Sequence, residues 1–89
     1  MDTLLTDPVE IRRSVVRSKA GNYSAWAGLI LQNADRHPIL AQSEKESLEQ
    51  LLQQLQQIGR DSEDPQGLLQ RAPDILSDLS QECRRRASQ

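Results

Sequence analysis

Apolar residues recur along this chain every three to four positions, which is the spacing of amphipathic helices, and no alternating run is long enough for a half-buried strand. The clearest stripe lies in residues 43–59, SEKESLEQLLQQLQQIG. Its apolar side chains fall within about 120° of one another on a helical wheel. They are Leu48, Leu51, Leu52, Leu55 and Ile58. A capping box of Ser43 with Glu46 predicts where this helix begins, and Gly59 predicts where it ends.

Two further helices are predicted before this stripe. The first is expected to begin with an N-terminal capping signature and to stop at Gly21. The signature consists of Asp7, Pro8 and Glu10. The second is expected from about Tyr23 to Ala34, because His37-Pro38 disfavours helical geometry directly afterwards. The short connection between the two predicts antiparallel neighbours.

In the last third of the chain, the apolar positions keep the same helical phase before and after Pro73. Asp64-Pro65 repeats the start signal of the first helix. The apolar positions that follow are Leu68, Ala72, Ile75, Leu76, Leu79 and Cys83. Proline has no backbone N–H and its ring collides with the carbonyl four residues earlier, which is that of Leu69. The last helix is therefore expected to be kinked or broken at Pro73.

These signals together predict an all-α fold, a small four-helix antiparallel bundle that becomes five segments if the last helix breaks. Eighty-nine residues support a single helical domain over 1–89. Within it, residues 1–6 are expected to form an N-terminal tail, 59–64 a polar loop and 84–89 a basic, frayed C-terminal tail. With no Phe, one Trp and one Tyr, the core must be aliphatic.

The net charge of −2 is unevenly distributed along the chain. Residues 37–83 carry nine acidic and three basic groups, whereas residues 84–89 carry three arginines. A nucleic-acid-binding protein usually has a larger basic surplus. The single cysteine excludes an internal disulfide, and no apolar run approaches the ~18 residues of a transmembrane helix. The acidic N-terminus lacks the apolar segment of a signal peptide, so a cytoplasmic protein without a membrane partner is expected.

Candidate chemistry is sparse. The chain has one His and one Cys, His37 and Cys83, and nothing near Cys83 indicates an activated thiolate. The acidic cluster at residues 61–64 lacks the spacing and the glycine of a calcium loop, and the four glycines form no phosphate-binding motif. The sequence therefore predicts a protein that is not an enzyme and that has no catalytic residue, cofactor, metal ligand or small-molecule substrate.

The first two predicted helices have apolar faces about 180–200° wide, which is more than one small core needs. This excess favours a non-enzymatic helical protein–protein interaction module, acting as an adaptor, regulator or small assembly subunit. Its partner is another protein or a second copy of the chain, as a homodimer. The residues leave open which apolar face is core and which is interface. The candidate partner-binding residues are Arg12, Val16, Lys19, Tyr23, Trp26 and Ile30.

Two alternatives remain. A small nucleic-acid-associated regulator would use basic side chains of the first helix and the C-terminal arginines, although no aromatic residue is interleaved with them for base stacking. The candidate phosphate contacts are Arg13, Arg17, Arg84, Arg85 and Arg86. The second alternative rests on size: several short amphipathic helices in about 90 residues are similar to a death-fold-like interaction domain, a likeness at the level of the fold.

Overall fold

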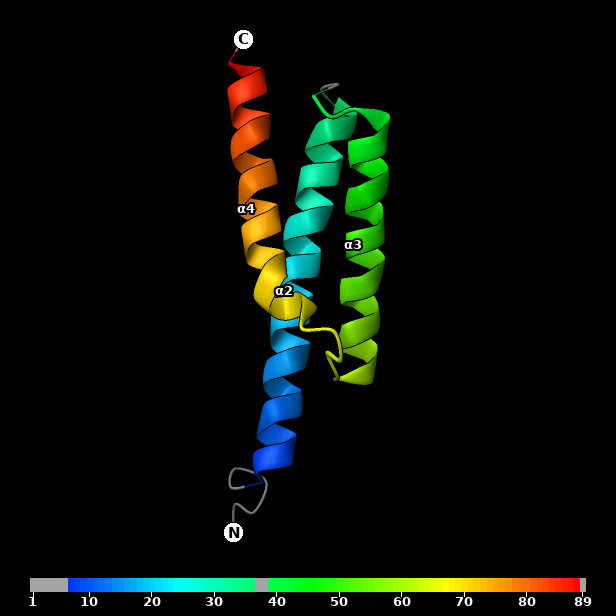
Figure 1. Ribbon diagram of the computed structural model, residues 1–89, viewed down its shortest axis with the longest axis vertical. Coiled ribbons are helices and arrows are strands. Elements are labelled where there is room, and N and C mark those ends of the chain that lie inside the picture. The colour runs from blue at the N-terminus through cyan, green and yellow to red at the C-terminus, as the bar shows by residue number, and fades with distance from the viewer. Residues whose placement is uncertain (1–6, 37–38, 89) are drawn as a thin grey trace.

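The computed structural model describes residues 7–36 and 39–88, which form three helices in up-down-up order (Figure 1). They are α2 (Pro8–Arg36), α3 (Gln42–Asp61) and α4 (Leu68–Ala87). No strand occurs within these residues. The predicted all-α class is confirmed, but the predicted four-helix bundle is wrong, because the described ranges hold three helices. The expected tail at residues 1–6 lies outside the described residues, as do His37 and Pro38.

The two helices predicted before residue 37 are one helix of 29 residues, α2. Its predicted start is confirmed, because Oδ1 of Asp7 accepts hydrogen bonds from the backbone N–H groups of Val9 at 3.0 Å and Glu10 at 3.4 Å. The predicted stop at Gly21 is wrong. A glycine inside a helix costs about 1 kcal/mol, and packing of the residues on both sides of Gly21 offsets that cost. The buried ones are Ala20, Ala27, Ile30 and Ala34.

Helix α3 begins and ends differently from the prediction. Its N-cap is Ala41 and not Ser43, and the helix start is held by Glu44, whose Oε1 accepts the N–H of Ala41 at 2.9 Å. The helix continues past Gly59, and Ser62 ends it with a left-handed φ of 57°. The ideal Cβ position of Gly59 lies 3.6 Å from the Cβ of Ala20, an ordinary van der Waals distance, so α3 lies beside α2 at this point. The predicted polar loop at 59–64 is therefore displaced to 62–67.

Helix α4 begins at Leu68 with Gly67 as its N-cap, three residues later than the predicted start directly after Asp64, and it does not break. The Asp64 carboxylate accepts the N–H groups of Leu68 at 2.8 Å and Leu69 at 2.9 Å, across the turn that contains Gly67. The helix runs through Pro73 as one element, because the apolar residues on both sides of the proline pack on the same core; a kink there stays a prediction. Residues 84–87, where a frayed tail was expected, are helical.

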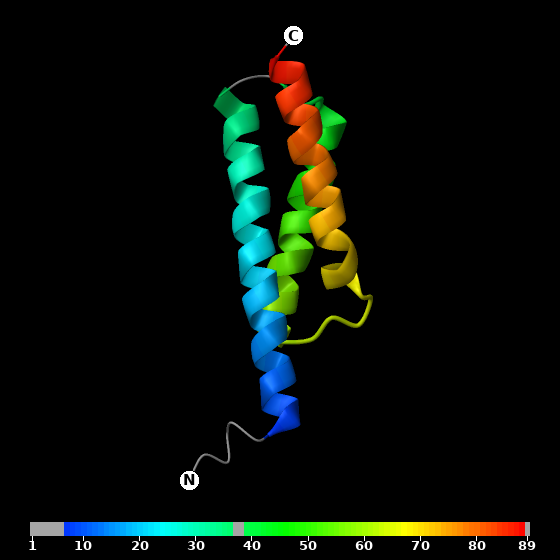
Figure 2. The ribbon, with the colours of Figure 1, turned by 90° about the vertical axis from the view of Figure 1, so that its left-hand side faces the viewer.

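The leucine stripe of α3 faces the core of its own chain. Leu48, Leu51, Leu55 and Ile58 are all buried. Helix α3 lies along α2 from the hydrogen bond of Arg17 with Ser62 to the ion pair of Asp35 with Lys45. Helix α4 covers the later part of α2 only, so the first turns of α2 extend beyond the other helices (Figures 1 and 2).

Candidate protein-binding surface on helix α2

The uncovered part of α2, residues 8–19, is called the protruding half here, and residues 20–36 are the packed half. No residue of the protruding half is buried. Val9 is 59% exposed, and Ile11 and Val15 are each 46% exposed. Val16 is half-buried and contacts the edge of the core. Large aliphatic side chains thus lie in solvent on a segment that neither of the other two described helices covers.

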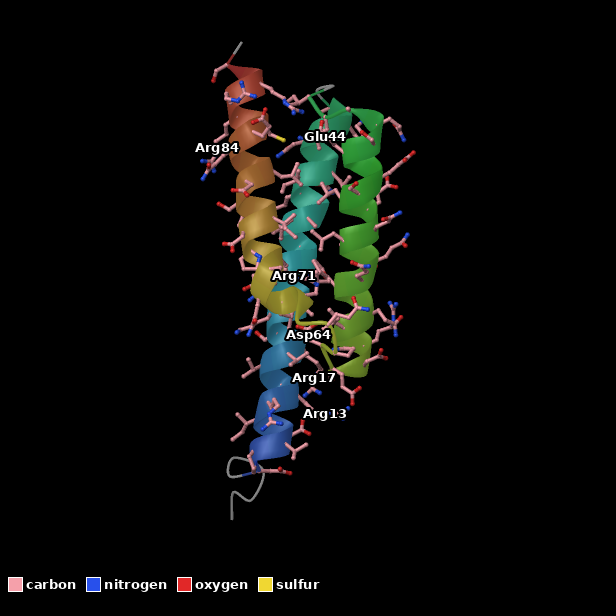
Figure 3. The ribbon with its side chains drawn as sticks, viewed as in Figure 1. Arg13, Arg17, Glu44, Asp64, Arg71 and Arg84 are labelled. Carbon is pink, nitrogen blue, oxygen red and sulfur yellow. The ribbon has the colours of Figure 1, made fainter. Side chains whose placement is uncertain are left out.

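A shallow cleft separates the protruding half from the loop that follows α3. Its helix side consists of Val9, Arg12, Arg13 and Val16, and its loop side of residues 62–65. Arg17 fastens the two sides, since its Nη1 donates to Oγ of Ser62 at 2.9 Å and its Nη2 to Oε1 of Glu10 at 3.0 Å. Figure 3 shows Arg13 and Arg17 on the side of α2 that faces the end of α3.

The six predicted partner-binding residues lie along one line of α2, and the structure divides that line between surface and core. Arg12 and Lys19 are exposed and Val16 is half-buried, as a binding surface requires. Ile30 is 7% exposed, so its side chain belongs to the core, and its role as a partner contact stays a prediction. The same line of the helix meets α4 in the packed half, and this neighbour buries it.

Tyr23 and Trp26 lie in the first two turns of the packed half. Both are half-buried and pack against the core. The indole Nε1–H of Trp26 donates to Oγ of Ser80 in α4 at 3.1 Å, so the polar atom of this side chain already has a partner. The tryptophan therefore joins α4 to α2, with part of its ring left at the surface.

The basic C-terminus is engaged within the chain. Arg86 forms a bidentate pair with Glu44 of α3, through Nη1 at 2.8 Å and Nη2 at 3.1 Å. Its Nη1 also donates to the carbonyl of Ile39 at 3.1 Å, and its Nε to Glu82 at 3.0 Å. Arg85 pairs with Glu82. The hydrogen bond from Arg86 holds the pKa of Glu44 below its ordinary value of 4.5, and that from Arg85 lowers the pKa of Glu82.

The predicted phosphate contacts are thus not brought together. Arg17, Arg85 and Arg86 are engaged by other side chains. Arg13 lies beside the loop, whereas Arg84 is at the far end of α4 (Figure 3). Among the described residues, Arg13 and Arg84 have no side-chain hydrogen bond or ion pair. Two arginines at opposite ends of the molecule make a weak footprint for a nucleic-acid backbone.

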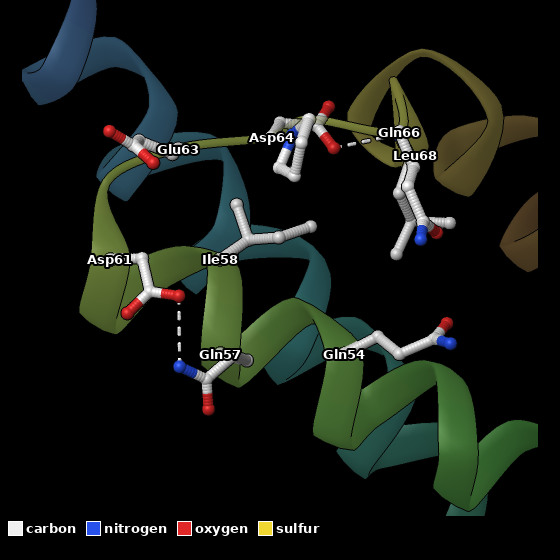
Figure 4. A pocket seen from close by; sticks show the side chains of 9 residues that line it. Gln54, Gln57, Ile58, Asp61, Glu63, Asp64, Gln66 and Leu68 are labelled. Atoms are coloured by element: carbon white, nitrogen blue, oxygen red, sulfur yellow. Dashed lines mark hydrogen bonds between the residues drawn. The ribbon is translucent and has the colours of Figure 1, made fainter.

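A second hollow lies between the end of α3 and the following loop (Figure 4). Its polar side chains serve local structure: Oδ2 of Asp61 accepts the Nε2–H of Gln57 at 2.9 Å, and Asp64 caps α4. No group of three or more potential metal ligands occurs in the described ranges. Cys83 is half-buried against the core, and this burial raises the pKa of its thiol. A protonated thiol is a poor nucleophile.

The sequence patterns predicted a broad apolar face on the first helix but did not indicate that Val9, Ile11 and Val15 would be exposed. The signal that finds them is a difference in length. Helix α2 has 29 residues, whereas α3 and α4 have 20 each. At about 1.5 Å per residue, the longer helix must extend past its neighbours at one end. Only the continuity of α2 through Gly21 makes this comparison available.

None of the helices in residues 7–36 and 39–88 combines the length and the hydrophobicity needed to cross a membrane. The chain matches no known protein-family model, no curated protein and no solved structure. The described residues define its class as an all-α protein of three helices, with one long helix that extends past the other two.

Proposed function

We propose that this chain is a non-enzymatic helical protein–protein interaction module, and that the protruding half of α2 carries its binding surface. The observation behind the proposal is that Val9, Ile11 and Val15 are exposed on a segment that no other helix covers. Complete burial of a valine or isoleucine side chain contributes about 1.5–3 kcal/mol. A partner that covers these residues therefore gains free energy that the isolated chain does not.

The charges around the surface favour a protein partner over nucleic acid. Arg12, Arg13 and Lys19 flank the exposed valines and set the orientation of a partner through complementary acidic groups. Of the C-terminal arginines that would extend a phosphate footprint, Arg85 and Arg86 are paired within the chain. In this proposal the protein acts in the cytoplasm as an adaptor, regulator or small assembly subunit. The death-fold alternative assumed several short helices, and three long ones offer it no support.

The proposal is tested by placing a photo-activatable cross-linking residue at position 15 of the full chain and expressing it in the organism that encodes it. A matched control carries the same residue at position 53, where an exposed glutamine lies on the polar face of α3. Discrete cross-linked species are expected from position 15 and not from position 53. No product from position 15, or the same products from both positions, would reject the protruding half as the binding surface.

A further inference from the structure

The side of α2 turned away from the core forms one continuous exposed line over both halves of the helix. Its positions alternate in steps of four and three, which keeps them in one row on a helix. Ile11 and Val15 lie at one end and Leu29, 59% exposed, lies at the other, with small side chains between them. We call this row the outer stripe. Its residues are Ile11, Val15, Ser18, Asn22, Ala25 and Leu29, and all six are exposed.

The outer stripe is complementary to itself in the antiparallel direction. Because its steps read the same from both ends, a second copy turned by 180° places Leu29 against Ile11 and Ala25 against Val15. Ser18 then faces Asn22 of the second copy, and the two can form a hydrogen bond. A two-fold interface uses the same patch on both subunits, so every such contact occurs twice.

Small residues in the middle of the stripe allow the two helices to approach closely, since the distance between helix axes depends on the side chains at the contact. Gly21 borders this region, and a Cβ atom added to it would have no atom within 4 Å in its own chain. The bulky aliphatic side chains then fill the wider space toward each end of the pair.

The charges at the two ends of α2 fit the same register. Asp7 begins the helix and Arg36 ends it, and both are exposed. In the antiparallel pair, Asp7 lies opposite Asn33 of the second copy and within roughly one helical turn of its Arg36. The side chain of Arg36 has no hydrogen bond or ion pair among the described residues. Asp7 uses only Oδ1 for its capping bonds, so Oδ2 is available as an acceptor.

A groove beside the packed half completes this arrangement. It lies between α2 and α4 and its lining includes Leu29, Asn33 and Arg84. The acidic start of the second α2 therefore meets an amide and exposed arginines, one of them from α4. Opposite charges face each other at both ends of the pair, whereas a parallel pair would bring the two Asp7 carboxylates together and the two Arg36 side chains together.

From these observations we infer that two copies of this chain associate by antiparallel pairing of the outer stripe of α2. The protruding half of each copy is covered by the packed half of the other, over a stripe roughly 27 Å long. The inference rests on the proposed function, because it names a second copy as the partner of the same exposed helix.

The first test compares two substitutions of exposed aliphatic residues by sedimentation equilibrium of the purified full chain. Leu29→Glu places a charge within the pair, and by symmetry it does so twice. We expect the dissociation constant to rise about a hundredfold or more. Ile75→Glu is the matched control, because Ile75 is 41% exposed but lies on α4, in the groove toward α3. We expect that variant to dimerise as the original chain does.

The second test reports direction and register. Cys83 is first replaced by Ser, and single cysteines are then introduced as Ile11→Cys and Leu29→Cys. Under mild oxidation we expect a disulfide when the two variants are mixed, and little when either is alone, because Cβ atoms must approach to about 4 Å. A parallel pair would instead link the Ile11→Cys variant to itself.

Three results would overturn the inference: a monomer at high micromolar concentration, a dimer disrupted by Ile75→Glu but not by Leu29→Glu, or self-linking of the Ile11→Cys variant. The proposed function fails separately. A chain that is monomeric in isolation but is cross-linked from position 15 to a different protein would reject the second copy as partner and keep the protein-binding surface.

Discussion

The two halves of α2 share one helix and one apolar spacing, yet they differ in what their apolar residues do. In the packed half, Ala20, Ala27 and Ala34 recur every seven residues and are almost completely buried. Their small side chains allow α3 to lie close, since a Cβ atom added to Gly59 would lie 3.6 Å from the Cβ of Ala20. The next position of this seven-residue spacing toward the N-terminus is Arg13 and not an alanine. The close contact of α2 with α3 ends before that position.

The protruding half carries four large aliphatic side chains although it has the smaller share of the core. It contains Val9, Ile11, Val15 and Val16, whereas the fully enclosed positions of the packed half are alanines. Bulky side chains at solvent-exposed positions add nothing to the core that this chain forms. The difference shows that the width of an apolar face on a helix does not predict how many of its side chains are buried. Burial depends on where the neighbouring helices end.

The largest expected effect comes from making one substitution in both halves. Ile30→Ala removes a side chain from the core and should lower the free energy of unfolding by about 2–5 kcal/mol. Ile11→Ala, on the protruding half, should lower it by less than about 1 kcal/mol. Urea denaturation at low protein concentration measures both. Equal losses would mean that the protruding half is packed within the monomer.

Overpacking gives the next largest effect. Ala27→Leu adds volume where α2 meets α3 and should destabilise the fold by about 1–3 kcal/mol. Ala25→Leu adds the same volume on the outer side of the same helix and should change stability by no more than about 0.5 kcal/mol. Thermal melts of the two variants make the comparison. A neutral Ala27→Leu would contradict the close contact of α2 with α3.

The two aspartates that cap helices, Asp7 and Asp64, should differ in their contribution to stability, because only the start of α4 belongs to the packed part of the fold. Asp64→Ala removes the acceptor for two N–H groups at the start of α4 and should cost about 0.5–2 kcal/mol. Asp7→Ala loosens the end of the protruding half, which the core does not need, so global unfolding should change little. Amide hydrogen exchange separates the two cases, since the second variant should lose protection only in the first turns of α2.

The smallest expected effect is the loss of stability at acidic pH when Glu44 becomes protonated. The pKa of Glu44 is lowered from 4.5 because Arg86 donates hydrogen bonds to its carboxylate. The folded chain therefore binds fewer protons at this group than the unfolded chain, so its contribution to stability is present above pH 4.5 and is lost as the pH falls through the lowered value. Between about pH 6 and pH 3, the melting temperature should fall more steeply for the original chain than for Arg86→Gln.

The cases in which prediction failed share one cause. Ser43, Gly21 and Pro73 were interpreted from their own preferences, each worth about 1–3 kcal/mol. Burial of residues beside Gly21 and Pro73 outweighs those preferences, and Glu44 holds the start of α3 one residue before Ser43. The ion pair of Arg86 with Glu44 joins residues 42 positions apart in the sequence. Local sequence patterns cannot predict such a pair, so the C-terminal arginines were expected to form a frayed tail.

The amino-acid sequence by itself determined the all-α class, the aliphatic core, the start of α2 at Asp7 and the apolar stripe of α3. Each of these follows from spacing and capping within a few residues of the chain. Only the tertiary structure decided that α2 is a single helix, that Ile30 is core while Val15 is surface, and that three of the five candidate phosphate contacts are already paired. Those outcomes depend on which segment covers which, and the free energy of burial, summed over the whole core, exceeds any one residue's local preference.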